Sequence, residues 1–67
     1  MMERKPAGQK EMKVFKELSL VPLEFDSLAG RTGMDPPNLL AALTTLELEG
    51  WIERLPGNRF VRKERSP

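Results

Sequence analysis

The sequence contains no cysteine, no histidine and no tyrosine among its 67 residues. Without cysteine a disulfide is impossible, and without cysteine or histidine a transition-metal site lacks its usual ligands. The activated thiol and the imidazole base on which many enzymes depend are missing as well. We therefore expect no cofactor, no metal site, no catalytic residue and no small-molecule substrate, and we do not expect an enzyme.

Long apolar stretches are also missing. No run approaches the roughly 18 residues of a membrane-spanning helix, and the chain does not start with the apolar segment of a signal peptide. We therefore expect a cytoplasmic protein without a membrane partner. A chain of 67 residues forms one small domain with a modest core, which leaves no room for a large internal pocket.

Charge is nearly balanced over the whole chain, at a net +1, but it is unevenly distributed. Residues 1–17 hold five basic and three acidic residues, and residues 51–67 hold five basic and two acidic ones. Residues 18–50 hold five acidic residues and one basic residue. The two ends of the chain are therefore basic and the middle is acidic.

The spacing of apolar residues predicts a first helix from residue 9 or 10 to residue 18 or 19. Met12, Phe15 and Leu18 recur at every third position, and Val14 lies at the flank of this apolar face. A short extended piece is expected shortly after this helix, over residues 23–25.

Two further helices are predicted, each with an aspartate before it. Asp26 can cap a helix over residues 27–32, which ends at Gly33. Asp35 can cap a longer helix over residues 36–49, whose first turn begins with two prolines. Two helices joined by such a short turn form a helix-turn-helix.

A β-hairpin follows the helices. Residues 51–55 and 59–62 are strand-like, and Pro56-Gly57 between them favours a type II turn. This order of elements is typical of the α+β winged helix-turn-helix fold, with three helices plus a short β-hairpin wing in a small two- or three-stranded sheet. We expect a flexible tail or linker over residues 1–9, the winged-helix domain over residues 10–63 and a disordered C-terminus over residues 64–67.

The most distinctive stretch runs from residue 46 to residue 60 and reads LELEGWIERLPGNRF. It resembles the C-terminal winged-helix domain of the DprA/Smf family of bacterial DNA-processing proteins. In that family leucine and glutamate alternate into a glycine, and an Arg-Leu-Pro-Gly-Gly-Arg-Tyr-like wing follows. This chain departs from the pattern at Asn58, where a second glycine is usual, and at Phe60, where tyrosine is common.

The resemblance covers residues 13–62 and implies a parent protein that binds single-stranded DNA during natural transformation and helps to load the RecA recombinase. In the family those activities lie mainly on a Rossmann-like domain, which this sequence does not contain. The resemblance therefore implies an auxiliary module and not the activity of the whole protein.

The third predicted helix has an outer face without charge. At about 100° per residue, its inner arc holds Leu39, Ala42, Leu43 and Leu46. Its outward side includes Leu40, Ala41, Thr44 and Leu48. These four are candidate docking residues for a protein partner, such as the parent's Rossmann-like domain or a second copy. Alternatively, Leu40 and Leu48 are flank residues that the first helix and the wing half-bury.

The basic residues of the hairpin form the other candidate surface. Arg54, Arg59, Arg62 and Lys63 can hold phosphates without reading bases. Alternatively, they are solvated edge charges that discourage strand-to-strand aggregation. Trp51 is expected to pack in the core and not to stack on bases.

These observations favour an auxiliary module of a DprA/Smf-like protein of DNA uptake and recombination, with weak, sequence-independent DNA contact through the basic wing. The first alternative is a protein-docking or dimerisation module that uses the third helix. The second alternative is the DNA-binding half of a transcriptional regulator. That role calls for basic residues on the third helix, and none lies between Asp35 and Glu49.

Overall fold

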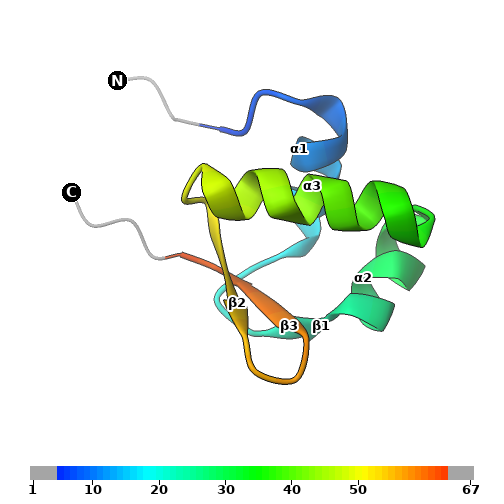
Figure 1. The fold of residues 1–67 in the computed structure, drawn as a ribbon, viewed down its shortest axis with the longest axis vertical. Coiled ribbons are helices and arrows are strands. Elements are labelled where there is room, and N and C mark those ends of the chain that lie inside the picture. Colours follow the sequence, from blue (N-terminus) through cyan, green and yellow to red (C-terminus); the bar gives the residue numbers. More distant parts are fainter. Residues whose placement is uncertain (1–4, 64–67) are drawn as a thin grey trace.

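A computed structural model of the chain describes residues 5–63 (Figure 1). The helices are α1 (Gln9–Glu17), α2 (Phe25–Thr32) and α3 (Pro36–Leu48). The strands are β1 (Leu23–Glu24), β2 (Ile52–Leu55) and β3 (Arg59–Arg62). Three helices and a small antiparallel sheet confirm the predicted α+β winged-helix fold. Residues 1–4 and 64–67 of the predicted tails lie outside the described residues, whereas Pro6 is buried and Gln9 begins α1.

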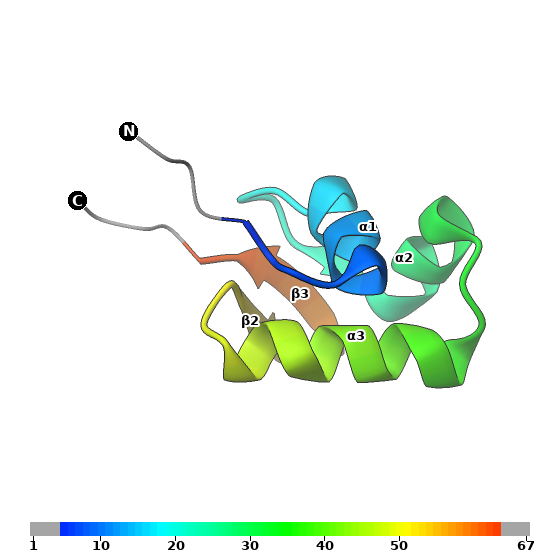
Figure 2. The same cartoon turned by 90° about the horizontal axis from the view of Figure 1, so that it is seen from above.

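The sheet has the order β1-β3-β2, so β3 lies in the middle. Its register pairs Phe60 with Leu23 on one side and with Arg54 on the other. In both views α3 crosses the molecule, and the β2–β3 hairpin, which we call the wing, projects beyond the helices in Figure 1 (Figures 1 and 2). The turn of the wing has positive φ at Gly57 and Asn58, 85° and 57°, which glycine and asparagine tolerate best.

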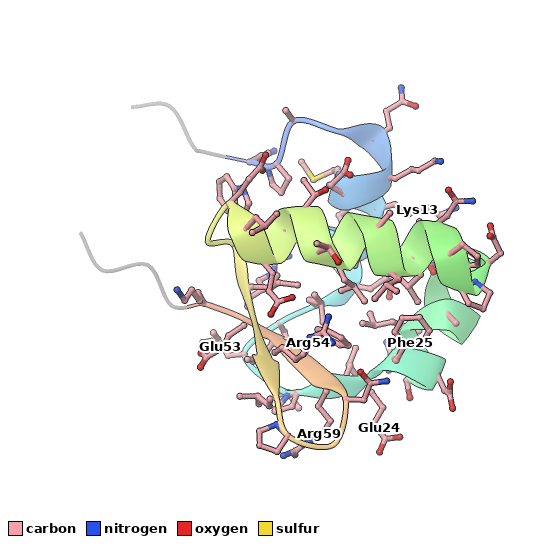
Figure 3. All side chains as sticks on the ribbon, viewed as in Figure 1. Lys13, Glu24, Phe25, Glu53, Arg54 and Arg59 are labelled. Atoms are coloured by element: carbon pink, nitrogen blue, oxygen red, sulfur yellow. The ribbon has the colours of Figure 1, made fainter. Side chains whose placement is uncertain are left out.

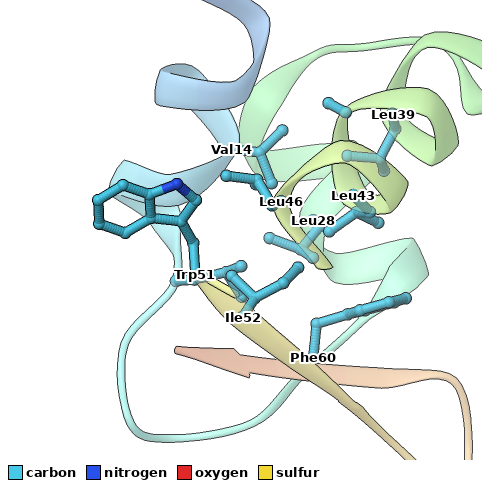
Figure 4. Close-up of a cluster of buried hydrophobic side chains, with 10 residues drawn as sticks. Val14, Leu28, Leu39, Leu43, Leu46, Trp51, Ile52 and Phe60 are labelled. Atoms are coloured by element: carbon cyan, nitrogen blue, oxygen red, sulfur yellow. The ribbon is translucent and has the colours of Figure 1, made fainter. Parts of the chain in front are cut away.

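The core lies between the helices and the inner face of the sheet (Figure 4). All four residues of the predicted inner arc of α3 are buried, which confirms the orientation of that helix. From the sheet, Ile52 and Phe60 are almost wholly excluded from solvent, and Trp51 is 8% exposed. The cluster also holds Val14, Leu18 and Leu28.

Two local predictions were wrong. The buried residues are Val14 in α1 and Leu18 directly after it, four residues apart, while Met12 and Phe15 are only half-buried. The second helix begins two residues early, at Phe25, and Asp26 lies in its first turn instead of capping it. The reason for the second error is a tertiary contact.

That contact joins the start of α2 to the wing. The Phe25 N–H donates to the Asn58 carbonyl at 3.1 Å, so the first helical residue finds its partner in the wing turn. At the base of the wing, the Trp51 N–H donates to the Leu46 carbonyl of α3 at 2.9 Å, and β2 begins at the next residue, Ile52. The wing is therefore bonded to the helices at both ends.

Candidate functional site

The outer face of α3 consists of Leu40, Ala41, Thr44 and Leu48. All four are exposed in the structure, and Leu48 is 83% and Leu40 47% accessible. Leu48 is thus not covered by the first helix or the wing, whereas Leu40 is covered by about half. No arginine or lysine occurs between Asp35 and Glu49, so the helix offers phosphates no cation of its own.

The N-terminus of α3 already carries an anion. The Asn38 side chain donates to the Asp35 carboxylate at 2.7 Å, and Lys10 of α1 donates to Asn38 at 2.8 Å. The hydrogen bond from the Asn38 side chain is the main reason that the pKa of Asp35 lies below its ordinary value. A carboxylate therefore occupies the helix end that attracts phosphates in many proteins.

Arg59 lies at the start of β3, at the tip of the wing (Figure 3). Its Nε–H donates to the Pro56 carbonyl at 3.0 Å, which fixes the guanidinium against the turn. Within residues 5–63 its terminal nitrogens make no hydrogen bond or ion pair, and the residue is exposed. Glu24 is its register partner on β1, so the positive charge has an acidic neighbour.

Arg54 belongs to the wing, on β2, and its side chain pairs with α3 (Figure 3). Its guanidinium is 5.0 Å from the centroid of the Phe60 ring. Its Nη2 lies 3.4 Å from the Glu47 carboxylate on α3, a hydrogen-bonded ion pair that the sequence reasoning missed. The charge of Arg54 is therefore partly neutralised, although the side chain remains 41% exposed.

Arg62 faces the helices. Its Nε and Nη2 donate to the carbonyl of Phe15 at 3.2 and 2.8 Å, in the last turn of α1, and the same carbonyl also accepts the backbone N–H of Leu18 at 3.1 Å. The guanidinium also lies 3.9 Å from the centroid of the Phe15 ring, which makes an edge contact with Trp51. Arg62 thereby ties the end of the wing to α1.

Lys63 follows β3 and is exposed, and its backbone N–H donates to the Trp51 carbonyl at 3.0 Å. The structure therefore separates the four predicted basic residues. Arg59 and Lys63 are exposed at the two ends of β3, Arg54 is paired with α3, and Arg62 is bonded to α1.

A further feature escaped the sequence reasoning. An open groove of about 430 Å³ lies along α1, between this helix and the segment before it. It is lined by Pro6, Ala7, Gly8, Gln9, Met12, Lys13, Lys16 and Glu17. The sequence predicted a flexible tail or linker over residues 1–9 and gave no sign that Pro6 is buried. We call this feature the α1 groove.

Comparison with known families gives one finding. The sequence model described as "DprA winged helix domain" matches residues 3–58 of the chain. Comparisons with curated proteins and with solved structures gave no match. Among residues 5–63, none of the helices has the length and apolar character that a membrane span requires.

Proposed function

The chain belongs to the DprA winged-helix domain family, and on this premise we propose that it contacts DNA weakly and without sequence preference through its wing. The family membership makes it a DprA-like auxiliary module. The proposed role is to add a phosphate contact to a cytoplasmic protein of DNA uptake, natural transformation and recombination. We propose no catalytic role for it.

One observation supports the proposal: Arg59 is exposed and held in place, and its terminal nitrogens have no partner within residues 5–63. Because its Nε–H is held by the Pro56 carbonyl, the guanidinium loses little freedom when its terminal nitrogens bind a phosphate. The wing tip projects from the body of the domain, so a duplex or a single strand can approach it (Figure 1). Lys63 adds a second exposed cation at the other end of β3.

The same geometry argues against base reading. A winged helix that reads sequence places its third helix in the major groove and contacts bases from it. Here α3 presents apolar side chains and threonine, and its first turn is preceded by the Asp35 carboxylate. The reading as half of a transcriptional regulator therefore lacks support from this helix.

Fluorescence anisotropy tests the proposal directly. The chain is titrated against labelled single-stranded and duplex DNA of unrelated sequences, from about 20 to 200 mM salt. We expect equal affinity for unrelated sequences. The slope of log affinity against log salt concentration should correspond to two or three phosphate contacts, at about 0.9 per contact for duplex and 0.7 for single strands. Absence of binding at the lowest salt, or a strong preference for one sequence, would contradict the proposal.

A second function has its own observation. The exposed leucines of α3 form an apolar stripe on its outer face, while its inner face is packed in the core. Exposed apolar faces of this kind mark protein contacts. Docking of a protein partner on this face is compatible with DNA contact through the wing, since the two surfaces share no residue.

A further inference from the structure

The α1 groove is an apolar depression with a basic rim. Its apolar lining includes Pro6, which is buried, and Met12, which is half-buried. Its volume of about 430 Å³ is in the range of ligand-binding clefts. Lys13 and Lys16 lie three residues apart on α1, hence on one side of the helix, and both are exposed. The occupant should therefore be apolar at its centre and acidic at its edge.

Glu17, the acidic residue of the groove, does not neutralise the positive charge of the two lysines. Glu17 forms an ion pair with Arg31 of α2 at 3.8 Å. Lys13 and Lys16 have no ion pair within residues 5–63. Two cations therefore remain available to an acidic partner.

The complementary chemistry lies at the C-terminal end of α3. Leu48 is 83% exposed, more than Leu20, Val21 or Leu40, the other exposed large apolar residues of residues 5–63. Glu47 and Glu49 flank it in the sequence, and Glu49 is exposed without an ion pair among the described residues. The chain thus carries an apolar side chain between acidic ones on one surface and an apolar groove with lysines on another.

We infer that the α1 groove of one copy of this chain receives Leu48 of a second copy, with Glu49 of the second copy beside Lys13 and Lys16. This inference rests on the docking function proposed for α3 and names its partner. Lys13, Lys16 and Leu48 are all exposed in the same copy, so one copy offers both surfaces at once. Because the two surfaces differ, the contact is heterologous and adds copies head to tail.

The association should be weak. A single leucine and a short groove bury much less than the roughly 800 Å² per partner of a stable complex. We therefore expect a dissociation constant between about 1 μM and 1 mM. Salt should weaken the contact, because exposed lysine–glutamate pairs contribute to it.

Sedimentation velocity of the chain over a concentration series up to about 1 mM provides the first measurement. The average mass should rise with concentration above the 7.6 kDa of one chain. Leu48→Lys should remain monomeric, since a charged side chain replaces the apolar anchor. Val21→Lys is the matched control, because this valine is 68% exposed but lies outside both α3 and the α1 groove, and it should associate as the wild type does.

A mixing experiment then identifies the groove. Lys13→Glu/Lys16→Glu should also remain monomeric, since its groove repels Glu49 while its own Leu48 is intact. An equimolar mixture of this variant with Leu48→Lys leaves one intact groove and one intact leucine, and it should form dimers although neither variant associates alone. Circular dichroism of each variant verifies that it is folded.

Three outcomes would overturn the inference in different ways. A wild-type chain that stays monomeric at about 1 mM removes self-association. Association that needs Leu48 but yields no dimer in the mixture removes the groove and keeps α3 docking, with two α3 helices as the contact. Association that persists in Leu48→Lys removes docking through α3 as well.

Discussion

The outer face of α3 and the wing follow one another in the chain, yet their surfaces have opposite chemistry. The outer face of α3 is uncharged, and the opposite face of the same helix is buried in the core. The wing is a short hairpin whose charged residues contact neighbouring elements to different degrees. The comparison shows that a winged-helix fold does not by itself assign DNA contact to its third helix.

A second contrast lies within the wing. Arg59 and Arg62 are the first and last residues of the same strand, and sequence alone makes them equivalent cations. Arg59 is bonded only to its own turn, whereas Arg62 is bonded to a carbonyl 47 residues away. Arg59 is thus held only within the wing, whereas Arg62 joins the wing to α1.

Replacing Arg62 with alanine should give the largest effect. Two charge-assisted hydrogen bonds and a contact with the Phe15 ring are lost, which should lower the free energy of unfolding by about 2 kcal/mol. Urea denaturation followed by Trp51 fluorescence measures it. Arg59→Ala is the control, with an expected change within about 0.5 kcal/mol. Equal losses in the two variants would remove the contrast within the wing.

The next effect concerns DNA. Arg59→Gln/Lys63→Gln should reduce DNA affinity about tenfold at low salt and lower the salt slope by about two contacts. The variant Lys13→Gln/Lys16→Gln changes the net charge equally on α1 and should bind DNA as the wild type does. Anisotropy titrations compare the two. Equal weakening by both pairs would mean that binding follows net charge and not the wing.

A smaller and opposite effect is expected at Glu47. Glu47→Gln removes the anion beside Arg54, so the guanidinium gains freedom to bind phosphate. Exposed ion pairs are weak, and the gain in DNA affinity should therefore be about two- to threefold at low salt. Glu53→Gln is the control, because Glu53 is exposed on β2 without an ion pair in residues 5–63. An equal gain in both variants would show that Glu47 does not mask Arg54.

The smallest effect concerns acid stability at the start of α3. The pKa of Asp35 is lower in the folded chain than its ordinary value, so its contribution is present above the unfolded pKa of about 3.9 and is lost as pH falls through the folded value. Asp35→Asn should therefore lose less stability than the wild type between pH 5 and pH 2. Thermal midpoints over this range measure it, and identical acid limbs would contradict the role of the Asn38 hydrogen bond.

The elements that the sequence predicted correctly are those with local causes. The inner arc of α3 followed from helical periodicity, and all of its members are buried. Positive φ at Gly57 followed from the type II turn expected of Pro56-Gly57. The family pattern between residues 46 and 60 agrees with the match to the DprA winged helix domain.

The features that the sequence did not predict depend on distant contacts. Phe25 begins α2 because a carbonyl of the wing turn accepts its N–H. Arg62 could not be distinguished from Arg59 without knowing that β3 ends beside the last turn of α1. The α1 groove, by contrast, is local: it depends on how residues 6–8 pack against the helix that directly follows them.

The central claim is that the wing contacts DNA and the outer face of α3 does not. Ala41→Glu tests it most directly, because it adds a negative charge to the middle of the exposed α3 face, at a position where a helix tolerates glutamate. In salt-dependent anisotropy titrations, Ala41→Glu should bind DNA as the wild type does, while Arg59→Gln/Lys63→Gln binds about tenfold more weakly. Loss of binding in Ala41→Glu, with wild-type binding in the wing variant, would contradict the account.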